Sequence, residues 1–229
     1  TKRKWLKHIP LLIIEICVLI AAIGVMYVVV TATKEVESKT IGKEKITINE
    51  EVAETIREEE ENNETKGYRN IALFGVDARD GELGRGTRSD SIIIASINQD
   101  TQEIKLVSVF RDTYLNLGND SYNKCNAAYA QGGPEQAISM LNTNMDLDIT
   151  DYVTVGFGGL IDAVDALGGI EIEVTEAEIS HLNNYQLCMA EELGVDYIPV
   201  KESGMQLLNG MQATAYCRIR YTKGDDFRR

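Results

Sequence analysis

Histidine and cysteine are scarce in this sequence. Its 229 residues include two histidines and four cysteines. These residues lack the short Cys/His spacings of a zinc site, and neither His8 nor His181 has a sequence neighbour that marks it as a catalytic base. Cys188 and Cys217 could form a disulfide outside a cell or remain buried thiols. The shortage therefore gives no support to zinc chemistry or to histidine-based catalysis.

Positive charge is also in short supply. The chain has 23 Lys and Arg against 36 Asp and Glu, a net charge of -13. This acidic balance predicts no nucleic-acid partner, because nucleic acids are bound mainly through basic surfaces. Between Asp112 and Cys217 there is no arginine, and only Lys124 and Lys201 are cationic. The arginines are therefore concentrated at a few places, which favours a polyanion site on an otherwise acidic protein.

One long apolar run lies near the N-terminus. Ile9 to Val30 is nearly all apolar, and at about 1.5 Å per residue a helix of this length crosses the roughly 30 Å core of a bilayer. We predict a transmembrane helix at residues 9–33 rather than a cleaved signal peptide, whose apolar region is shorter. The basic residues in 1–8 predict a cytoplasmic tail. The protein would then be a single-pass cell-membrane protein with the rest of the chain outside the cell.

The rest of the chain divides by composition. Residues 34–67 are charged and poor in aromatics, which predicts an extracellular spacer that is at most partly helical. The globular part is expected at 68–229. There, short apolar runs typical of strands buried on both faces alternate with helical patterns. This alternation predicts an α/β sandwich with helices on both faces of a central mixed β-sheet.

The pattern also predicts individual elements. In chain order they are strands at 71–76, 92–97 and 104–110, a helix from Pro134 to Met145, a strand at 152–157, a helix at 158–167, an edge strand at 170–174 and a helix after Asn209. The second and third strands should form a hairpin. We expect the helix at 158–167 to bury Leu160, Val164 and Leu167 on one face and to end at Gly168-Gly169.

Carboxylates and arginines adjoin the ends of the first three strands. They are Asp77, Arg79, Arg88, Asp90, Arg111 and Asp112. Sites in α/β sheets collect at strand ends. Arginine forks match phosphate oxygens, and two carboxylates suit Mg²⁺ that is shared with a diphosphate. The alternative interpretation is a set of surface salt bridges, each worth about 0 to 1 kcal/mol.

The motifs that carry these residues resemble those of a known family. They are Asn70–Arg79, Arg88–Asp90, Val109–Tyr114, Lys124–Tyr129, Asp165–Gly169, Leu208–Gly210 and Tyr216–Arg220. Their order and spacing are similar to those of LytR-CpsA-Psr proteins. The resemblance covers essentially all of residues 69–229, and a single N-terminal span before an external domain matches the family's usual layout.

The resemblance implies an α/β/α fold and a set of ligands. Asp77 and Asp90 would hold Mg²⁺. The substrate-binding residues would be Arg79, Arg88, Arg111, Arg218, Arg220 and Arg229, the last at the family's Asp-Phe-x-Arg position. The family's motif continues to an Arg-Gln pair, whereas this sequence ends at Arg229. We therefore expect the catalytic domain, 68–229, to be incomplete at its C-terminus.

The resemblance further implies a transferase. Such an enzyme takes a teichoic-acid or capsular glycopolymer from a polyprenyl diphosphate carrier and attaches it to peptidoglycan. Arg88 and Arg111 would stabilise charge on the diphosphate while a sugar hydroxyl of the acceptor attacks phosphorus. Asp112 is a candidate base because it adjoins Arg111, with an orienting role as the alternative. A non-catalytic binder or sensor of lipid-linked saccharides and a polyprenyl-diphosphate hydrolase are the alternative functions.

Overall fold

The computed structural model describes residues 36–61, 67–78 and 83–220. The predicted cytoplasmic tail and transmembrane helix therefore lie outside the described residues, as do Arg79 and Arg229. Within the described ranges, no helix combines the length and apolar character needed to cross a bilayer.

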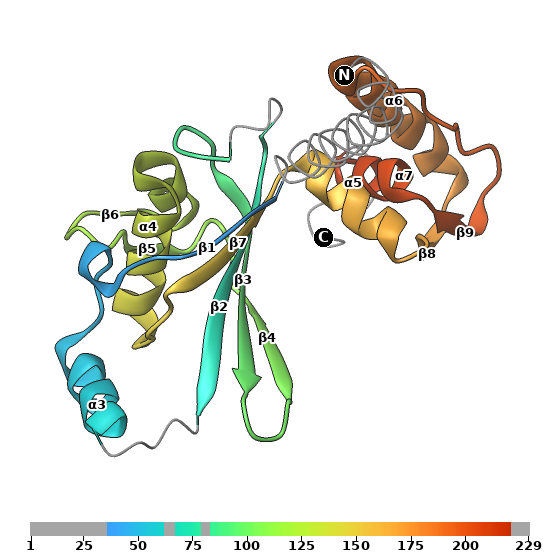
Figure 1. Cartoon of the computed structure of the whole chain (residues 1–229). Coiled ribbons are helices and arrows are strands. Elements are labelled where there is room, and N and C mark those ends of the chain that lie inside the picture. Colours follow the sequence, from blue (N-terminus) through green and yellow to red (C-terminus); the bar gives the residue numbers. More distant parts are fainter. Residues whose placement is uncertain (1–35, 62–66, 79–82, 221–229) are drawn as a thin grey trace, which may run out of the picture. The chain divides into compact units, whose positions relative to one another are not determined.

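Helices and strands alternate along much of the described chain (Figure 1). The elements are β1 (Val36–Thr40), the 3-10 helix η2 (Lys43–Lys45), α3 (Glu50–Glu61), β2 (Tyr68–Val76), β3 (Ser89–Asn98), β4 (Ile104–Ser108), β5 (Tyr114–Asn116), β6 (Tyr122–Lys124), α4 (Asn126–Met145), β7 (Asp151–Val155), α5 (Phe157–Ala166), β8 (Ile170–Val174), α6 (Glu176–Leu193), β9 (Gly204–Leu208) and α7 (Gly210–Cys217).

Five strands form a mixed sheet in the order β1-β7-β2-β3-β4. The β2–β7 pair is parallel, and the other three pairs are antiparallel. The predicted hairpin of the second and third strands is confirmed as β3–β4. The α/β class with a mixed sheet is therefore confirmed, while the placement of helices on both of its faces stays a prediction.

The main core lies between the sheet and α4. Phe74 of β2 meets Tyr129 of α4 edge to face, with ring centroids 5.2 Å apart, and each such buried side chain contributes about 1.5 to 3 kcal/mol. The Tyr129 hydroxyl donates to the Leu83 carbonyl at 2.6 Å. The prediction that the strands are buried on both faces is wrong for β2, which is buried on one face only. Phe74 and its neighbours on that face are buried, whereas Ile71 and Leu73 on the other face are half-buried.

Part of the predicted spacer belongs to this fold. β1 pairs with β7 from Val36 opposite Val155 to Thr40 opposite Asp151. Just after β1, Ile41 and Ile46 are buried in the main core. These isolated apolar residues stand among charged ones and give no strand or helix period in the sequence. The folded part of the chain therefore begins before Tyr68.

A kink divides α4. Gly133 has φ 69°, a left-handed conformation that glycine adopts without steric cost, and Pro134 follows it. The predicted helix start at Pro134 is confirmed as the start of the second half of α4. The first half, from Asn126, was not predicted.

The segment after β7 has its own small cores. One contains Val174, Leu182 and Leu208, which join β8, α6 and β9. A second contains Met189 of α6 and Met211 of α7. β8 pairs with β9 in a separate two-stranded sheet, so the predicted strand at 170–174 is present but is not an edge of the mixed sheet.

Local signals at the helix ends of this segment are confirmed. Gly168 and Gly169, both at positive φ, follow α5, and Asn209 forms the predicted capping box with Gln212. The predicted apolar face of α5 is wrong in part. Val164 packs on a core, but Leu160 is 38% exposed and Leu167 is 84% exposed. Leu167 is the C-cap residue, beyond the last full turn.

Candidate functional site

The β2–β3 hairpin ends in a β-bulge that carries a carboxylate. Gly75 pairs with Ser91, whereas the next residue, Val76, pairs with Ser89. Asp90 is therefore the extra residue on β3, and Asp77 directly follows the end of β2. A bulge bends its strand and re-aims a side chain. The predicted metal residues and the neighbouring Arg88 thus lie at one end of this hairpin, as expected from the strand boundaries.

A turn after β4 positions the next pair of charges. The backbone N–H of Thr113 donates to the Phe110 carbonyl at 2.9 Å, which closes a turn around Arg111 and Asp112. The Arg111 carbonyl accepts from the N–H of Asn126 at 3.2 Å. That N–H belongs to the first turn of α4, where helix donors lack intrahelical partners. The turn is therefore fixed to the N-terminus of α4.

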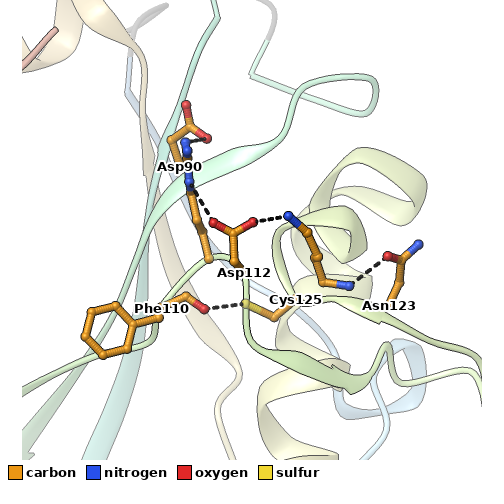
Figure 2. Close-up of polar contacts among 7 residues, drawn as sticks. Asp90, Phe110, Asp112, Asn123 and Cys125 are labelled. Atoms are coloured by element: carbon orange, nitrogen blue, oxygen red, sulfur yellow. Dashed lines mark hydrogen bonds and ion pairs between the residues drawn. The ribbon is translucent and has the colours of Figure 1, made fainter. Parts of the chain in front are cut away.

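Four side chains from these segments form a continuous row of ion pairs, which we call the charged row: Asp90, Arg111, Asp112 and Lys124 (Figure 2). Arg111 Nη1 lies 2.8 Å from Asp90 Oδ1. Arg111 Nε lies 3.5 Å from Asp112 Oδ2, and Lys124 Nζ donates to Asp112 Oδ1 at 2.6 Å. The row brings together three of the predicted site residues and adds Lys124.

Two members of the charged row, Arg111 and Asp112, have pKa values shifted by their neighbours. The nearby Asp90 carboxylate raises the pKa of Arg111, against a smaller effect of burial. The hydrogen bond from Lys124 lowers the pKa of Asp112 below its ordinary value. Exposed ion pairs of this kind add little to stability. The charged row therefore contributes little to the stability of the fold.

Cys125 lies beside the row but has different chemistry. Its thiol donates to the Phe110 carbonyl at 3.1 Å, and the Phe110 ring points away from the charged side chains (Figure 2). Burial raises the pKa of Cys125, so the sulfur stays a neutral thiol at neutral pH. Because the thiolate is the reactive form, Cys125 is not a nucleophile here. The other described cysteines, Cys188 and Cys217, are exposed thiols. The prediction that they form a disulfide or remain buried thiols is therefore wrong.

The residues at the hairpin end fit a magnesium ion that is shared with a ligand. Asp77 and Asp90 are both exposed, and Arg111 contacts only one oxygen of Asp90, Oδ1. In the described ranges there is no cluster of three or more His, Cys, Asp or Glu side chains that could hold a metal. Mg²⁺ commonly uses one or two protein carboxylates and completes its shell with waters and phosphate oxygens.

Arg218 is held in another way. It caps α7, and its guanidinium carbon lies 4.8 Å from the ring centroid of Phe157 and 5.3 Å from that of Tyr185. Its Nη1 atom is buried and has no hydrogen-bond partner in the described part of the chain. A buried donor without a partner costs free energy. An anion that reached Nη1 would remove that cost. Arg220, two residues on, is exposed.

A polar cleft of about 400 Å³ adjoins the turn before Arg88. Its lining includes Lys39, Lys45, Arg85 and Glu135. These charged side chains suit a polar ligand better than a prenyl chain.

Some functional candidates had no decisive signal in the sequence. Lys124 is one of only two cations between Asp112 and Cys217, and it lies in a motif of the resemblance, so a search for paired charges could have found it. Phe157 and Tyr185 could not be assigned to Arg218, because ordinary core aromatics look the same in a sequence.

Comparisons with known proteins agree with this fold and site. The model of the LytR_cpsA_psr family matches residues 25–229. The chain belongs to the LytR_cpsA_psr family. A curated relative from Enterococcus faecalis, the polyisoprenyl-teichoic acid–peptidoglycan teichoic acid transferase TagU, is 33% identical over 173 residues, which are 75% of this chain and 52% of the relative. The chain thus spans about half the length of the curated relatives it matches.

Solved structures show the same fold. TagT bound to LI-WTA superposes with a TM-score of 0.52 at 25% identity, over 69% of this chain and 56% of that chain. A LytR-CPS2A-psr family protein, YwtF (TagT), with bound octaprenyl pyrophosphate lipid gives a TM-score of 0.51 at 24% identity, over 69% of this chain and 60% of that chain. At this identity the second likeness concerns the fold alone.

Proposed function

We propose that the protein transfers a phospho-glycopolymer, of the teichoic-acid or capsular type, from a polyprenyl diphosphate carrier to peptidoglycan. The observation that carries the proposal is the charged row beside Asp77 at the bulged end of β2–β3. Family membership and the transferase name of the Enterococcus faecalis relative support it. A site with two carboxylates and several arginines suits a diphosphate better than an uncharged ligand.

Diphosphate binding is assigned to the arginines. Arg111 offers a fork at the charged row, and Arg88 lies next to the bulge. Arg218 and Arg220 are assigned to the same ligand. Arg218 supports this assignment with its buried Nη1, which lacks a protein acceptor among the described residues, and with a guanidinium that lies over two aromatic rings. Guanidinium forks bind two phosphate oxygens at once.

Asp77 and Asp90 would hold Mg²⁺ together with diphosphate oxygens. Bound there, the ion would offset the charge of the diphosphate and of the leaving polyprenyl phosphate. Arg111, which already pairs with Asp90, would stay in contact with both the carboxylate and the phosphate.

In the proposed reaction, the oxygen of an acceptor sugar hydroxyl forms a bond to the phosphorus nearer the glycopolymer. The bond from that phosphorus to the bridging oxygen breaks, and polyprenyl phosphate leaves with the electron pair. Asp112 accepts the hydrogen bond and then the proton of the hydroxyl. Its carboxylate is exposed and ionised, and its oxygens keep acceptor capacity beyond the bonds to Lys124 and Arg111.

We also propose that the protein is anchored in the cell membrane by residues 9–33, with a cytoplasmic N-terminus. Supporting this are the apolar run and the basic residues before it. The site would then face the extracellular side, where both peptidoglycan and the flipped lipid-linked donor are found.

Incubation of the purified protein with a radiolabelled polyprenyl-diphosphate saccharide and peptidoglycan fragments tests the function. Label on peptidoglycan with release of polyprenyl monophosphate is the expected result. Sugar phosphate released into water would instead identify a hydrolase, and retention of intact lipid would identify a sensor.

Arg111→Ala should abolish most of the transfer. Arg69→Ala is the matched control, because Arg69 also pairs with a carboxylate, Asp151 at 2.9 Å, but at the opposite end of β2. Equal losses in the two variants would point to general damage and not to a site at the charged row.

A further inference from the structure

The β5–β6 hairpin carries two tyrosines that have no role in the proposed reaction. Tyr114 lies opposite Lys124, and Asn116 lies opposite Tyr122. Directly opposed residues share a face of the hairpin, as do residues two apart on one strand. Tyr114, Tyr122 and Lys124 therefore lie on one face. Leu115 faces the other way and packs against the main core.

The two tyrosine rings form an exposed aromatic surface. Their centroids are 6.0 Å apart and their planes are inclined by 28°. Tyr114 is 69% exposed and Tyr122 is 59% exposed. Stacked aromatic rings on a short hairpin leave flat apolar faces in water, where they gain little from burial. Exposed aromatic clusters of this kind commonly mark binding surfaces.

The tyrosine face is continuous with the charged row. Lys124, directly opposite Tyr114, donates to Asp112 at 2.6 Å. Asp112 is thus the residue at which the row and the tyrosine face meet. Asp112 is also the residue assigned above to the acceptor hydroxyl, so a ligand on the tyrosines would lie on the acceptor side of the reaction.

The charge of the hairpin favours an uncharged ligand. The loop between β5 and β6 contains Asp120, and the one cation of the hairpin, Lys124, is already paired with Asp112. A phosphate-rich glycopolymer would be repelled by these carboxylates. Sugar rings without charge would not be. Their axial C–H groups form apolar faces that pack on aromatic rings.

We propose that Tyr114 and Tyr122 form the binding surface for the glycan strand of the peptidoglycan acceptor, whose N-acetylated sugar rings are uncharged. The assignment rests on the proposed function, because it takes Asp112 as the group that meets the acceptor hydroxyl. The tyrosines would hold the strand by ring stacking and so present a hydroxyl to the charged row.

Calorimetric titration of the purified protein with chitotetraose, an uncharged N-acetylglucosamine oligomer, tests the proposal. Replacing both tyrosines by Ala should weaken binding about tenfold or more, the effect of losing two ring stacks. Replacing both by Phe should keep the affinity, because the rings remain. Tyr68→Ala is the matched control, since Tyr68 is an exposed tyrosine that contacts Lys105 in the five-stranded sheet and not in the β5–β6 hairpin.

The same titrations separate the other outcomes. The proposal would be overturned if the double Ala variant kept the wild-type affinity for chitotetraose, or if the wild type did not bind it. It would also be overturned if the affinity for a poly(glycerol phosphate) oligomer depended more strongly on the tyrosines than the affinity for chitotetraose does. If the double Ala variant fails to fold, as judged by circular dichroism, a double Leu variant takes its place in the titration. Leu keeps an apolar side chain at both positions but has no aromatic ring. Farnesyl diphosphate with Mg²⁺, titrated into the wild type, tests the proposed function separately.

Discussion

The charged row and the surroundings of Arg218 use the same side chain in two ways. Arg111 in the row is half-buried, and its guanidinium contacts two carboxylates. Arg218 lies over two aromatic rings and has a buried Nη1 without a partner among the described residues. An anionic ligand must compete with carboxylates for Arg111, whereas it would supply the hydrogen-bond acceptor that Arg218 Nη1 lacks.

The contrast indicates a division of tasks. In the row, arginine and carboxylates are held together at the protein surface, which suits the proposed binding of a cation and the proposed proton transfer. Beside the rings, a guanidinium is partly removed from water, which strengthens its attraction to an anion. We therefore expect the row to control turnover and Arg218 to control affinity for the diphosphate.

The largest effect should come from the carboxylates at the bulge. Asp77→Ala and Asp90→Ala should each lower the rate of transfer by at least about 100-fold, because charge on the diphosphate is no longer offset. Asp100→Ala, at the opposite end of β3, is the control. Single-turnover assays with saturating donor measure the effect. Wild-type rates in either variant, or transfer that persists in a chelator, would remove the metal from the proposal.

The next largest effect should be at Arg218. Arg218→Lys keeps the charge but loses the fork and the ring contacts, so the Kd for a polyprenyl diphosphate should rise about 10- to 100-fold. Arg69→Lys should not change that Kd. If Arg218→Lys binds normally but turns over slowly, the division between affinity and turnover is wrong.

Arg111 allows a smaller, sharper test. Arg111→Lys should weaken diphosphate binding about tenfold or less. The Lys ammonium keeps the positive charge but loses one of the two hydrogen bonds that the guanidinium fork makes. Asp90→Asn should couple to it in a double-mutant cycle, since the two side chains touch. Additive effects would show that their ion pair has no part in binding, and the contrast with Arg218 would then lose its basis.

The smallest effect concerns pH. The Lys124 hydrogen bond lowers the pKa of Asp112, so the ionised form persists to lower pH than for an ordinary Asp, and activity that needs it is lost only as pH falls through that lowered value. Lys124→Met should raise the pKa and move the acidic limb of the rate profile to higher pH. An unmoved limb in the variant would assign Asp112 an orienting role.

Much of the fold could be predicted from local pattern. The apolar runs around Phe74 and Ile92 predicted the strands β2 and β3, and the short turn after Asn98 predicted the β3–β4 hairpin. The same pattern failed for β1, where a few apolar residues stand among charges, and for Leu167, where helical period continued past the end of the helix. A period shows which residues could share a face, but not where packing ends.

The sequence by itself determined the mixed α/β class and the family motifs that place Asp77, Asp90 and Arg111 at strand ends, because these depend on patterns within a few consecutive residues. Only the tertiary structure decided that Asp90 sits in a bulge, that Lys124 completes the charged row, and that Tyr114 stacks on Tyr122. Those contacts join segments through strand register and packing. Register is set by the whole core, and no short stretch of sequence contains it.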